Sequence, residues 1–352
     1  MAPVVKLLAH TGLVESRVCV TAQHREMLDQ VLNLFDIRPH YDLNLMREDQ
    51  SLAQLSANIF THLDPVLSDF KPDWVLAQGD TTTVAITALL TYFHRLKFGH
   101  VEAGLRTHDK WQPFPEEINR RVAGVTADLH FAPTEWAKNN LLREDIDASL
   151  IRVTGNTVID ALQFVANQAE PAEITELVGA KLQKNKLILV TAHRRENFGM
   201  PLENICNALK ELAARGDVEI VYPVHLNPNV QEPVNRLLRG LEHVTLLPPM
   251  DYLPLVHLMK HARLILTDSG GIQEEAPAFG IPTLVLRDVT ERPEGVEAGT
   301  LKLVGTETDR IVHAAAKLLD DETEYAQMAR AVNPYGDGHA AERIIQHLLE
   351  SQ

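Results

Sequence analysis

The sequence predicts an α/β protein with two doubly wound lobes and a cleft between them. Short apolar, β-branched runs alternate with amphipathic helical patterns along almost the whole chain, which is typical of parallel sheets with right-handed crossovers. Runs such as LILV at residues 187–190 are apolar throughout, as expected for strands covered by helices on both faces. The length of 352 residues fits two domains of roughly 150 residues each.

The strands and helices are expected at definite places in this alternation. In the first half the pattern predicts strands at residues 17–21, 74–78, 98–101, 129–132 and 151–154. In the second half it predicts them at residues 187–191, 219–222, 244–247, 264–267, 283–286 and 302–304. Helical patterns lie between them, for example at residues 25–35, 82–95, 133–142, 202–212 and 308–319. The boundary between the lobes is expected near residues 155–185, where the strand signal stops and Pro171 interrupts a polar helical stretch.

Composition excludes several classes of protein. The 45% hydrophobic and 23% charged fractions are those of an ordinary globular protein, and no stretch approaches the ~20 apolar residues that span a bilayer. Two cysteines, Cys19 and Cys206, cannot form a disulfide framework or a four-thiolate zinc site. The net charge of −15 makes nucleic acid and anionic membranes poor partners. The N-terminus lacks the features of a secretory signal, so we expect a cytoplasmic location.

Polar residues gather where predicted strands end, at residues 78–80, 100–106, 193–196, 223–225 and 267–271. Ligands of doubly wound folds bind beyond the carboxyl ends of the strands, so these segments are the candidates for a shared site. Each segment alone is also consistent with a helix cap or a solvated loop.

The segment that begins at Ser269 gives the most specific signal. A predicted strand delivers Ser269, Gly270 and Gly271 to the start of a helix, where free N–H groups and the helix dipole favour a diphosphate. Glu275 lies in the early turns of that helix, where its carboxylate is placed to accept both hydroxyls of a ribose. The alternative is an ordinary glycine-containing turn. No dinucleotide-binding or Walker pattern occurs, so we expect no cofactor.

Asp80, Glu102 and Glu116 form an acidic set in the first half. Carboxylates that converge are suited to proton transfer and to stabilising a positively charged sugar ring. Pro115 suits a helix start, so Glu116 and Glu117 also fit the alternative role of acids that stabilise the helix dipole.

Sixteen histidines invite a metal interpretation. His257 and His261 have helical i, i+4 spacing, but the sequence offers no obvious third ligand, so no metal is expected. His193 and His225 follow predicted strands and are better candidates for proton transfer or phosphate contact.

The sequence closely resembles the bacterial non-hydrolysing UDP-N-acetylglucosamine 2-epimerases. The matching strings cover nearly the whole chain in family order: TAQHR at 21–25, GDTTT at 79–83, HVEAGLR at 100–106, PEEINR at 115–120, TGNTVID at 154–160, HRRE at 193–196, PVHLNP at 223–228, TDSGGIQEE at 267–275 and TERP at 290–293.

The resemblance implies two Rossmann-like lobes of the GT-B type and a homodimer. It places an N-terminal lobe at residues 1–158, a UDP-binding lobe at 159–335 and a C-terminal helix at 336–352 that returns to the first lobe. It implies reversible conversion of UDP-N-acetylglucosamine to UDP-N-acetylmannosamine through a glycal, without NAD, to supply cell-surface polysaccharide.

The resemblance also implies the roles of individual residues. The family's catalytic residues fall on Asp80, Glu102, Glu116 and His193. Its UDP contacts fall on Met250, Leu255, Ser269, Gly270, Gly271, Glu275 and Arg292. A second, activating UDP-sugar site of some members falls on Gln23, His24, Arg194 and His225.

The start of the chain departs from the family pattern. The family begins with a strand and a Gly-Thr-Arg-Pro-Glu-Ala loop whose Arg and a following Lys contact the diphosphate, whereas this chain opens with a helical pattern at residues 2–9. We therefore expect the first strand to be missing and the activity to be weak or absent. An assay of UDP-N-acetylmannosamine formation, with and without the restored strand and loop, tests this expectation.

Three other functions fit part of the pattern. A hydrolysing epimerase would release UDP and free N-acetylmannosamine. A GT-B glycosyltransferase would need an acceptor and would not exchange the hydrogen on carbon-2. A non-catalytic UDP-sugar binding protein would use only the nucleotide-binding residues and would catalyse no reaction.

Overall fold

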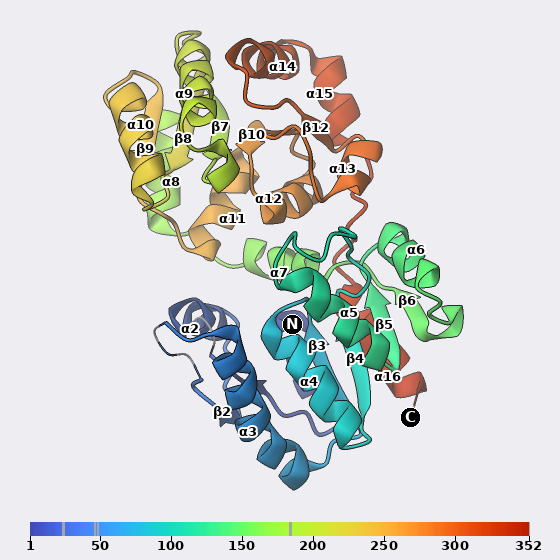
Figure 1. Ribbon diagram of the computed structural model, residues 1–352. Coiled ribbons are helices and arrows are strands. Elements are labelled where there is room, and N and C mark those ends of the chain that lie inside the picture. The colour runs from blue at the N-terminus through green and yellow to red at the C-terminus, as the bar shows by residue number, and fades with distance from the viewer. Residues whose placement is uncertain (23–24, 46, 48, 183–184, 352) are drawn as a thin grey trace. The chain divides into compact units, whose positions relative to one another are not determined.

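The computed structural model describes residues 1–22, 25–45, 47, 49–182 and 185–351. The chain forms two compact units, Met1–Ala161 with Tyr335–Gln352 and Leu162–Pro334. We call them unit 1 and unit 2 (Figure 1).

Unit 1 is built on a four-stranded parallel sheet with the order β3 (Trp74–Gln78), β4 (Lys97–Val101), β5 (Leu129–Ala132) and β6 (Ile151–Val153). A separate parallel pair joins β1 (Cys19–Val20) to β2 (Tyr41–Asp42). Its helices are α1 (Ala2–Thr11), α2 (Arg25–Leu34), α3 (Leu52–Phe70), α4 (Thr82–Phe93), α5 (Glu116–Thr126), α6 (Glu135–Arg143), the start of α7 (Thr157–Ala166) and α16 (Ala340–Glu350).

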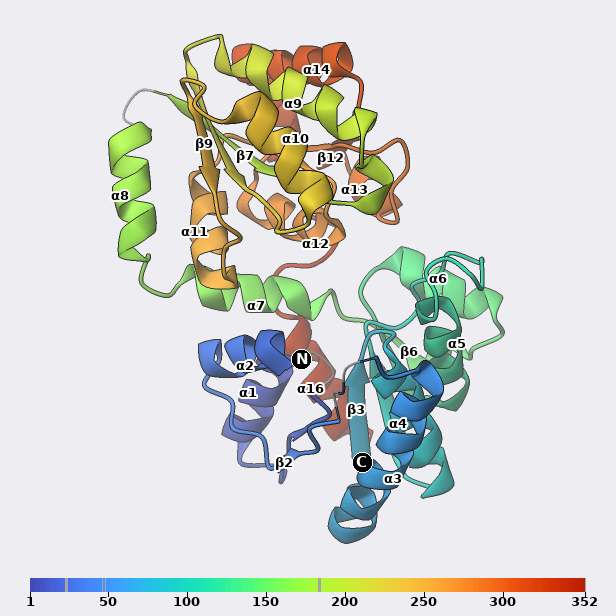
Figure 2. The ribbon, with the colours of Figure 1, turned by 60° about the vertical axis from the view of Figure 1, so that its left-hand side comes forward.

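Both faces of this sheet are covered. Phe98 of β4 packs with buried residues of α4 and α5 on one face, whereas Val101 and Phe131 pack with α1 and α16 on the other. Figure 2 shows the red α16 beside the blue α1 within unit 1. The last helix of the chain therefore completes the core of the unit that contains the first residues.

Local signals in the sequence explain where the helices begin. Ser51 accepts a hydrogen bond from the backbone of Gln54, whose side chain returns one to Ser51, and this capping box starts α3. Thr81 accepts from the N–H of Val84 at the start of α4. Asp160 caps α16 from a distant part of the chain by accepting from backbone N–H groups at 3.2 and 2.7 Å.

Unit 2 contains a six-stranded parallel sheet with the order β12 (Leu301–Leu303), β11 (Thr283–Val285), β10 (Leu264–Thr267), β7 (Lys186–Thr191), β8 (Val218–Pro223) and β9 (Val244–Leu247). Its helices are α8 (Ala172–Lys181), α9 (Met200–Ala213), α10 (Pro228–Leu238), α11 (Tyr252–His261), α12 (Gly270–Glu275), α13 (Pro293–Glu297), α14 (Thr308–Asp320) and α15 (Glu322–Ala329). Three short 3-10 turns complete the described elements: Ala148–Leu150, Arg195–Asn197 and Ala276–Phe279.

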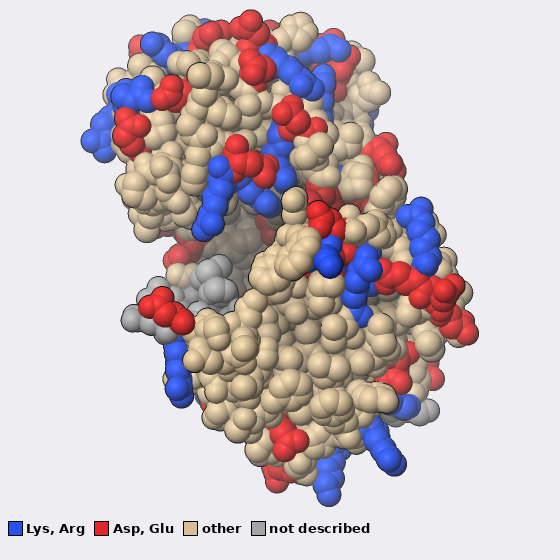
Figure 3. Space-filling model, in the orientation of Figure 1, with Lys and Arg blue, Asp and Glu red and all other residues tan. Residues whose placement is uncertain are grey.

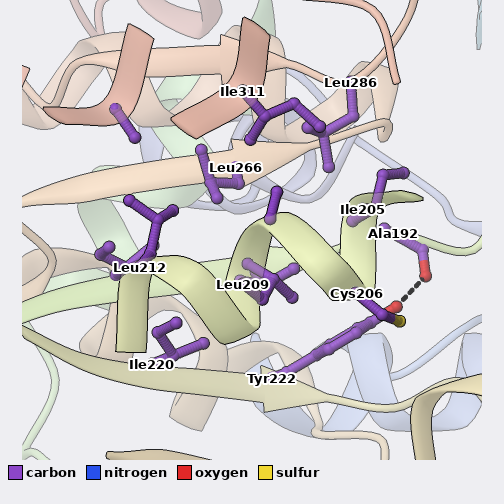
Figure 4. Close-up of a cluster of buried hydrophobic side chains, with 14 of the residues drawn as sticks. Ala192, Ile205, Cys206, Leu209, Leu212, Ile220, Tyr222, Leu266, Leu286 and Ile311 are labelled. Carbon is purple, nitrogen blue, oxygen red and sulfur yellow. Dashed lines mark hydrogen bonds between the residues drawn. The ribbon is translucent and has the colours of Figure 1, made fainter. Parts of the chain in front are cut away.

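The central strands of unit 2 are buried on both faces. Ile188 and Val190 of β7 pack into a large apolar cluster with α9, α10 and α14, part of which is drawn in Figure 4. Successive side chains of a strand point to opposite faces, and the alternate residues Leu187 and Leu189 are buried as well. Tyr222 of β8 lies in the same cluster, and its hydroxyl donates to the carbonyl of Ala192 at 2.5 Å.

The prediction of an α/β fold with two parallel-sheet lobes is confirmed. The expected strands at residues 74–78, 129–132, 244–247 and 264–267 coincide with β3, β5, β9 and β10. The expected strand at residues 17–21 is shorter, and β2 was not expected because only two residues pair in it. No helix in the described ranges combines the length and the apolar character that a membrane crossing requires.

Charged side chains of both signs are scattered over the face of the molecule drawn in Figure 3. On the face drawn in Figure 3, Lys and Arg are interspersed with Asp and Glu and form no continuous basic stripe. The net charge of −15 disfavours binding to a polyanion.

Candidate active site

Asp80 and Glu102 follow neighbouring strands of unit 1. Gln78 pairs with Val101 at the carboxyl ends of β3 and β4, and the N–H of Gly79 donates to the carbonyl of Val101 at 3.0 Å. The carboxylate of Glu102 accepts from Gln78 Nε2 at 3.1 Å. The backbone of Glu102 has φ +63°, a left-handed conformation that is uncommon for a residue with a β-carbon. The two acids therefore lie at one edge of the sheet, as the sequence predicts.

Glu116 lies at the first position of α5, and this helix is tied to Asp80 by Arg120. Arg120 Nη2 donates to Asp80 Oδ2 at 2.6 Å, and the Arg120 side chain is only 9% exposed. Glu116 and Arg120 are four residues apart and share a helix face. Glu116 Oε2 is buried and has no hydrogen-bond partner among the described residues. The third acid of the predicted set is thus on the helix that contacts the first.

Glu117, the neighbour of Glu116, has a structural role. Its fully buried carboxylate accepts from the N–H groups of Thr107 and His108, at 3.0 and 3.2 Å, and pairs with Arg120 at 3.4 Å. This explains why only one of the two adjacent glutamates is available for chemistry. No role was expected for Arg120 from the sequence, although its i, i+3 spacing from Glu117 was a usable signal.

The predicted nucleotide residues of unit 2 lie at a topological switch point. From β7 the chain proceeds to β8 and β9 on one side of the sheet, whereas β10, its other neighbour, leads to β11 and β12. His193 follows β7, and Ser269 follows β10. Ligands of doubly wound sheets bind at this point.

Gly270 and Gly271 leave the start of α12 open. A β-carbon at Gly271 would meet only Ser269 Oγ, at 4.0 Å, and one at Gly270 would meet Arg194 Nη2 at 3.5 Å. Ser269 occupies the N-cap position, and its N–H donates to Thr267 Oγ1 at 2.9 Å. A bulky anion can therefore approach the backbone closely here.

Glu275 is buried at the end of α12 and is held by Tyr252. The Tyr252 hydroxyl donates to Glu275 Oε1 at 2.8 Å. Burial raises the pKa of Glu275 to about 7, although the hydrogen bond from Tyr252 acts in the opposite direction. The preceding residue, Glu274, forms an ion pair with Arg292 Nε. Glu275 and Arg292 are both predicted UDP contacts. They are connected because Arg292 pairs with Glu274, the residue that precedes Glu275 in α12.

Met250 and Leu255 flank the start of α11, where both are partly buried. Leu255 and Tyr252 belong to the first turn of α11, so the predicted uracil-reading loop is continuous with the tyrosine that holds Glu275. Met250 and Leu255 thus lie where the backbone is expected to contact a base. The sequence analysis gave no role to Tyr252, because no pattern in the sequence connects this residue to Glu275.

His193 and His225 stack on each other at the ends of β7 and β8. Their ring centroids are 5.2 Å apart, and the interplanar angle is 6°. Burial lowers the pKa of His193, nearby Asp268 opposes this effect, and His225 and Arg194 add to it. His225 Nδ1 accepts from the N–H of Asn227 at 3.0 Å. A predicted catalytic histidine and a predicted regulatory histidine are therefore direct neighbours.

Arg194 lies beside the predicted diphosphate segment, because a β-carbon at Gly270 would be 3.5 Å from Arg194 Nη2. Arg194 Nη1 also lies 4.0 Å from Glu291 Oε1. Two other residues predicted for the second UDP-sugar site, Gln23 and His24, lie outside the described residues. Within the ranges that the structure describes, no group of three or more His, Cys, Asp and Glu side chains is arranged to hold a metal ion.

Unit 2 has the strand order 3-2-1-4-5-6 of nucleotide-binding α/β proteins. A Ser-Gly-Gly turn at its switch point, with the buried Glu275 behind it, is typical of proteins that bind a phosphorylated nucleoside. The family model described as UDP-N-acetylglucosamine 2-epimerase matches residues 6–349. The chain belongs to this family.

Individual relatives agree with this assignment. A UDP-N-acetylglucosamine 2-epimerase of Yersinia pestis is 55% identical over 358 residues, which cover 100% of this chain and 95% of the relative. The structure of UDP-GlcNAc 2-epimerase from Neisseria meningitidis bound to UDP-GlcNAc has 49% identity and a TM-score of 0.87, covering 99% of this chain and 96% of that one. That of the Methanocaldococcus jannaschii enzyme in complex with UDP-GlcNAc and UDP has 32% identity and a TM-score of 0.78, covering 99% and 95%.

Proposed function

We propose that this chain interconverts UDP-N-acetylglucosamine and UDP-N-acetylmannosamine by eliminating UDP and adding it back. The observation that carries the proposal is the acidic set at the ends of β3, β4 and the start of α5. The solved relatives from Neisseria meningitidis and Methanocaldococcus jannaschii described above hold UDP-GlcNAc. The hydrogen on sugar carbon-2 is not acidic. It becomes removable as the bond between carbon-1 and the UDP oxygen breaks, because positive charge then grows at carbon-1.

The elimination and its reversal balance without a cofactor. The bond from carbon-1 to oxygen breaks, a base takes the proton from carbon-2, and the products are UDP and an unsaturated glycal. An acid then returns a proton to the opposite face of carbon-2, and the UDP oxygen attacks carbon-1. This scheme needs an acid and a base on opposite faces of the ring and donors for the leaving diphosphate.

The catalytic roles in this proposal belong to Asp80, Glu102, Glu116 and His193. In support, Asp80 is oriented by Arg120 at 2.6 Å, and Glu102 is oriented by Gln78 at 3.1 Å. A carboxylate whose rotamer is fixed by a neighbour is better placed for proton transfer than a mobile one.

UDP is held, in this proposal, by residues of unit 2. The diphosphate contacts the backbone of Ser269, Gly270 and Gly271 and the side chain of Arg292, and the ribose hydroxyls donate to Glu275. Met250 and Leu255 flank the base. The open backbone at Gly271 and the fixed orientation of Glu275 support these assignments.

Further parts of the proposal rest on the family resemblance. They are a homodimer, a cytoplasmic location, a supply of precursor for cell-surface polysaccharide, lobes at residues 1–158 and 159–335 with the helix 336–352 added to the first, and an activating UDP-sugar site. Gln23, His24, Arg194 and His225 are the residues we assign to that second site. The stacking of His225 on His193 supports an influence of this site on catalysis.

Proton NMR of the reaction in deuterated water tests the proposal. We expect both UDP-sugars at equilibrium and deuterium at carbon-2. Free N-acetylmannosamine with UDP would indicate a hydrolysing epimerase. Turnover only in the presence of an acceptor, with no deuterium at carbon-2, would indicate a glycosyltransferase. No chemical change in any mixture would indicate a binding protein.

A pair of variants gives the matched control for this assay. Glu102→Gln removes one proposed acid or base, and a loss of about 10²–10⁴-fold in exchange rate is expected. Glu135→Gln changes an exposed glutamate of α6 in the same unit, and no comparable loss is expected. Equal losses in the two variants would contradict the assignment of Glu102.

A further inference from the structure

The turn after β7, which carries His193 and Arg194, is held from two sides. On one side, the hydroxyl of Tyr222 donates to the carbonyl of Ala192 at 2.5 Å, as Figure 4 shows. On the other side, the carboxylate of Asp268 accepts from the N–H groups of His193 and Arg194. The backbone just before His193 and the backbone of His193 itself are thus both anchored.

Asp268 is a fully buried carboxylate surrounded by neutral donors. It accepts from the His193 N–H at 3.1 Å through Oδ1 and 2.9 Å through Oδ2, from the Arg194 N–H at 2.8 Å and from Asn197 Nδ2 at 3.0 Å. Burying a carboxylate is costly unless hydrogen bonds replace its water. These bonds supply that replacement and fix the direction in which the turn leaves β7.

The charge of Asp268 also reaches the imidazole of His193. His193 Nδ1 lies 3.8 Å from Asp268 Oδ1. Among the described residues, His225, which is stacked on this ring, and Arg194, the next residue, are the other titratable groups that act on it. Asp268 is the negative member of this group, and it opposes the effect of burial, which lowers the pKa of His193.

We propose that Asp268 is a positioning residue that orients His193 for the reaction and stabilises its imidazolium form. Asp268 directly precedes Ser269, so one residue links the proposed diphosphate segment, the proposed catalytic histidine and the backbone of Arg194. The inference rests on the proposed function of His193 but adds a residue to which no role was assigned by the sequence pattern.

The variant Asp268→Asn tests the proposal. It keeps the size of the side chain, removes the charge and turns an amide donor towards N–H donors. We expect kcat to fall by at least about tenfold, because small errors in the position of a catalytic group are costly. The dissociation constant of UDP should change less than about threefold, because no UDP contact assigned here involves this carboxylate. The pKa of the His193 ring, followed by NMR, should fall.

Tyr222→Phe is the matched comparison. It removes a hydrogen bond to the same turn but leaves the negative charge in place, so the pKa of His193 should stay near that of the unmodified chain. If Asp268→Asn folds and changes neither kcat nor the titration of His193, the proposal is wrong. Equal shifts of that titration in the two variants would also overturn it, because the charge would then have no special effect.

A measurement on the unmodified protein covers the case in which Asp268→Asn does not fold. With ¹³C-labelled aspartate carboxyl groups, the Asp268 signal should move at the pH at which His193 titrates, and this movement should vanish in His193→Gln. An Asp268 signal that does not follow His193 would refute the proposal. The NMR titrations need no turnover, so they remain decisive even if the carbon-2 exchange assay rejects the epimerase reaction.

Discussion

At the scale of the single residue, Glu275 links protonation to the proposed binding of UDP. Burial raises the pKa of its carboxyl group to about 7. A carboxylate that accepts two ribose hydroxyls is stabilised in its ionised form, so binding should lower this pKa. UDP binding near and below pH 7 should therefore release a proton from Glu275.

The affinity for UDP is expected to depend on pH in a definite direction. Well above pH 7 Glu275 is ionised, and the affinity should level off. Between pH 7.5 and pH 6 it should weaken by about tenfold, because a proton must first be removed. Calorimetry in buffers of different ionisation enthalpy measures both affinity and proton release. Glu275→Gln should retain only the pH dependence of UDP itself, and an unchanged slope in this variant would contradict the assignment.

Arg120 gives the corresponding prediction in unit 1. Arg120→Met removes the 2.6 Å contact to Asp80, and kcat should fall by about 10²-fold because the carboxylate loses its fixed position. UDP affinity should change little, since the proposed UDP contacts lie in unit 2. Arg121→Met, which alters the next residue on α5 and a partner of Glu117, is the control. Similar kcat values for the two variants would argue against a specific role of Arg120.

At the scale of the element, the start of α16 depends on one buried side chain. Asp160 accepts from the N–H groups of Ala340 and Ala341. Removing a helix cap costs about 1 kcal/mol, and leaving buried donors unpaired adds about 1–3 kcal/mol. Asp160→Ala should therefore destabilise unit 1 by more than an exposed cap variant does.

Asp321→Ala provides that comparison. Asp321 is exposed and caps α15 by accepting from the N–H groups of Thr323 and Glu324. Urea unfolding should show a smaller loss of stability for Asp321→Ala, and hydrogen exchange should show faster exchange at residues 340–350 in Asp160→Ala alone. Equal protection of these residues in both variants would mean that Asp160 does not hold the helix.

Elements also show what the sequence reveals and what it does not. The runs of β5, β9 and β10 each follow a polar residue and end before a proline or an aspartate, so their ends could be placed to the residue. β2 has only two residues, too few for a pattern to develop. Arg120, Asp268 and Tyr252 were not assigned roles because each acts through a partner distant in sequence, and such pairs become visible only once the strands are aligned.

At the scale of the whole molecule, the two units differ in how the chain builds them. Unit 2 is one continuous segment, Leu162–Pro334, whereas unit 1 needs both Met1–Ala161 and Tyr335–Gln352. The apolar cluster of unit 2 is formed by its own strands and helices. A unit with its own core and one uninterrupted segment is able to fold alone.

Two fragments test this difference. A fragment of residues 157–334, which keeps α7 whole, should unfold cooperatively and bind UDP within about tenfold of the full chain, a change of about 1.4 kcal/mol. A chain without residues 336–352 should lose the side chains of Ile344 and Leu348 from the core of unit 1 and bind a hydrophobic dye. A fragment 157–334 that is unfolded, or a shortened chain that unfolds like the full one, would contradict this view of the units.

The membership of α16 in unit 1 has a consequence for synthesis on the ribosome. Since the polypeptide emerges from its amino end, the middle segment is available for folding before the final helix has been made. The segment of unit 1 that is translated first, residues 1–161, keeps an exposed apolar surface until α16 has been made. Unit 2, which is translated next, is therefore expected to reach its native state earlier. Chaperones that bind nascent chains would therefore be needed longest by residues 1–161.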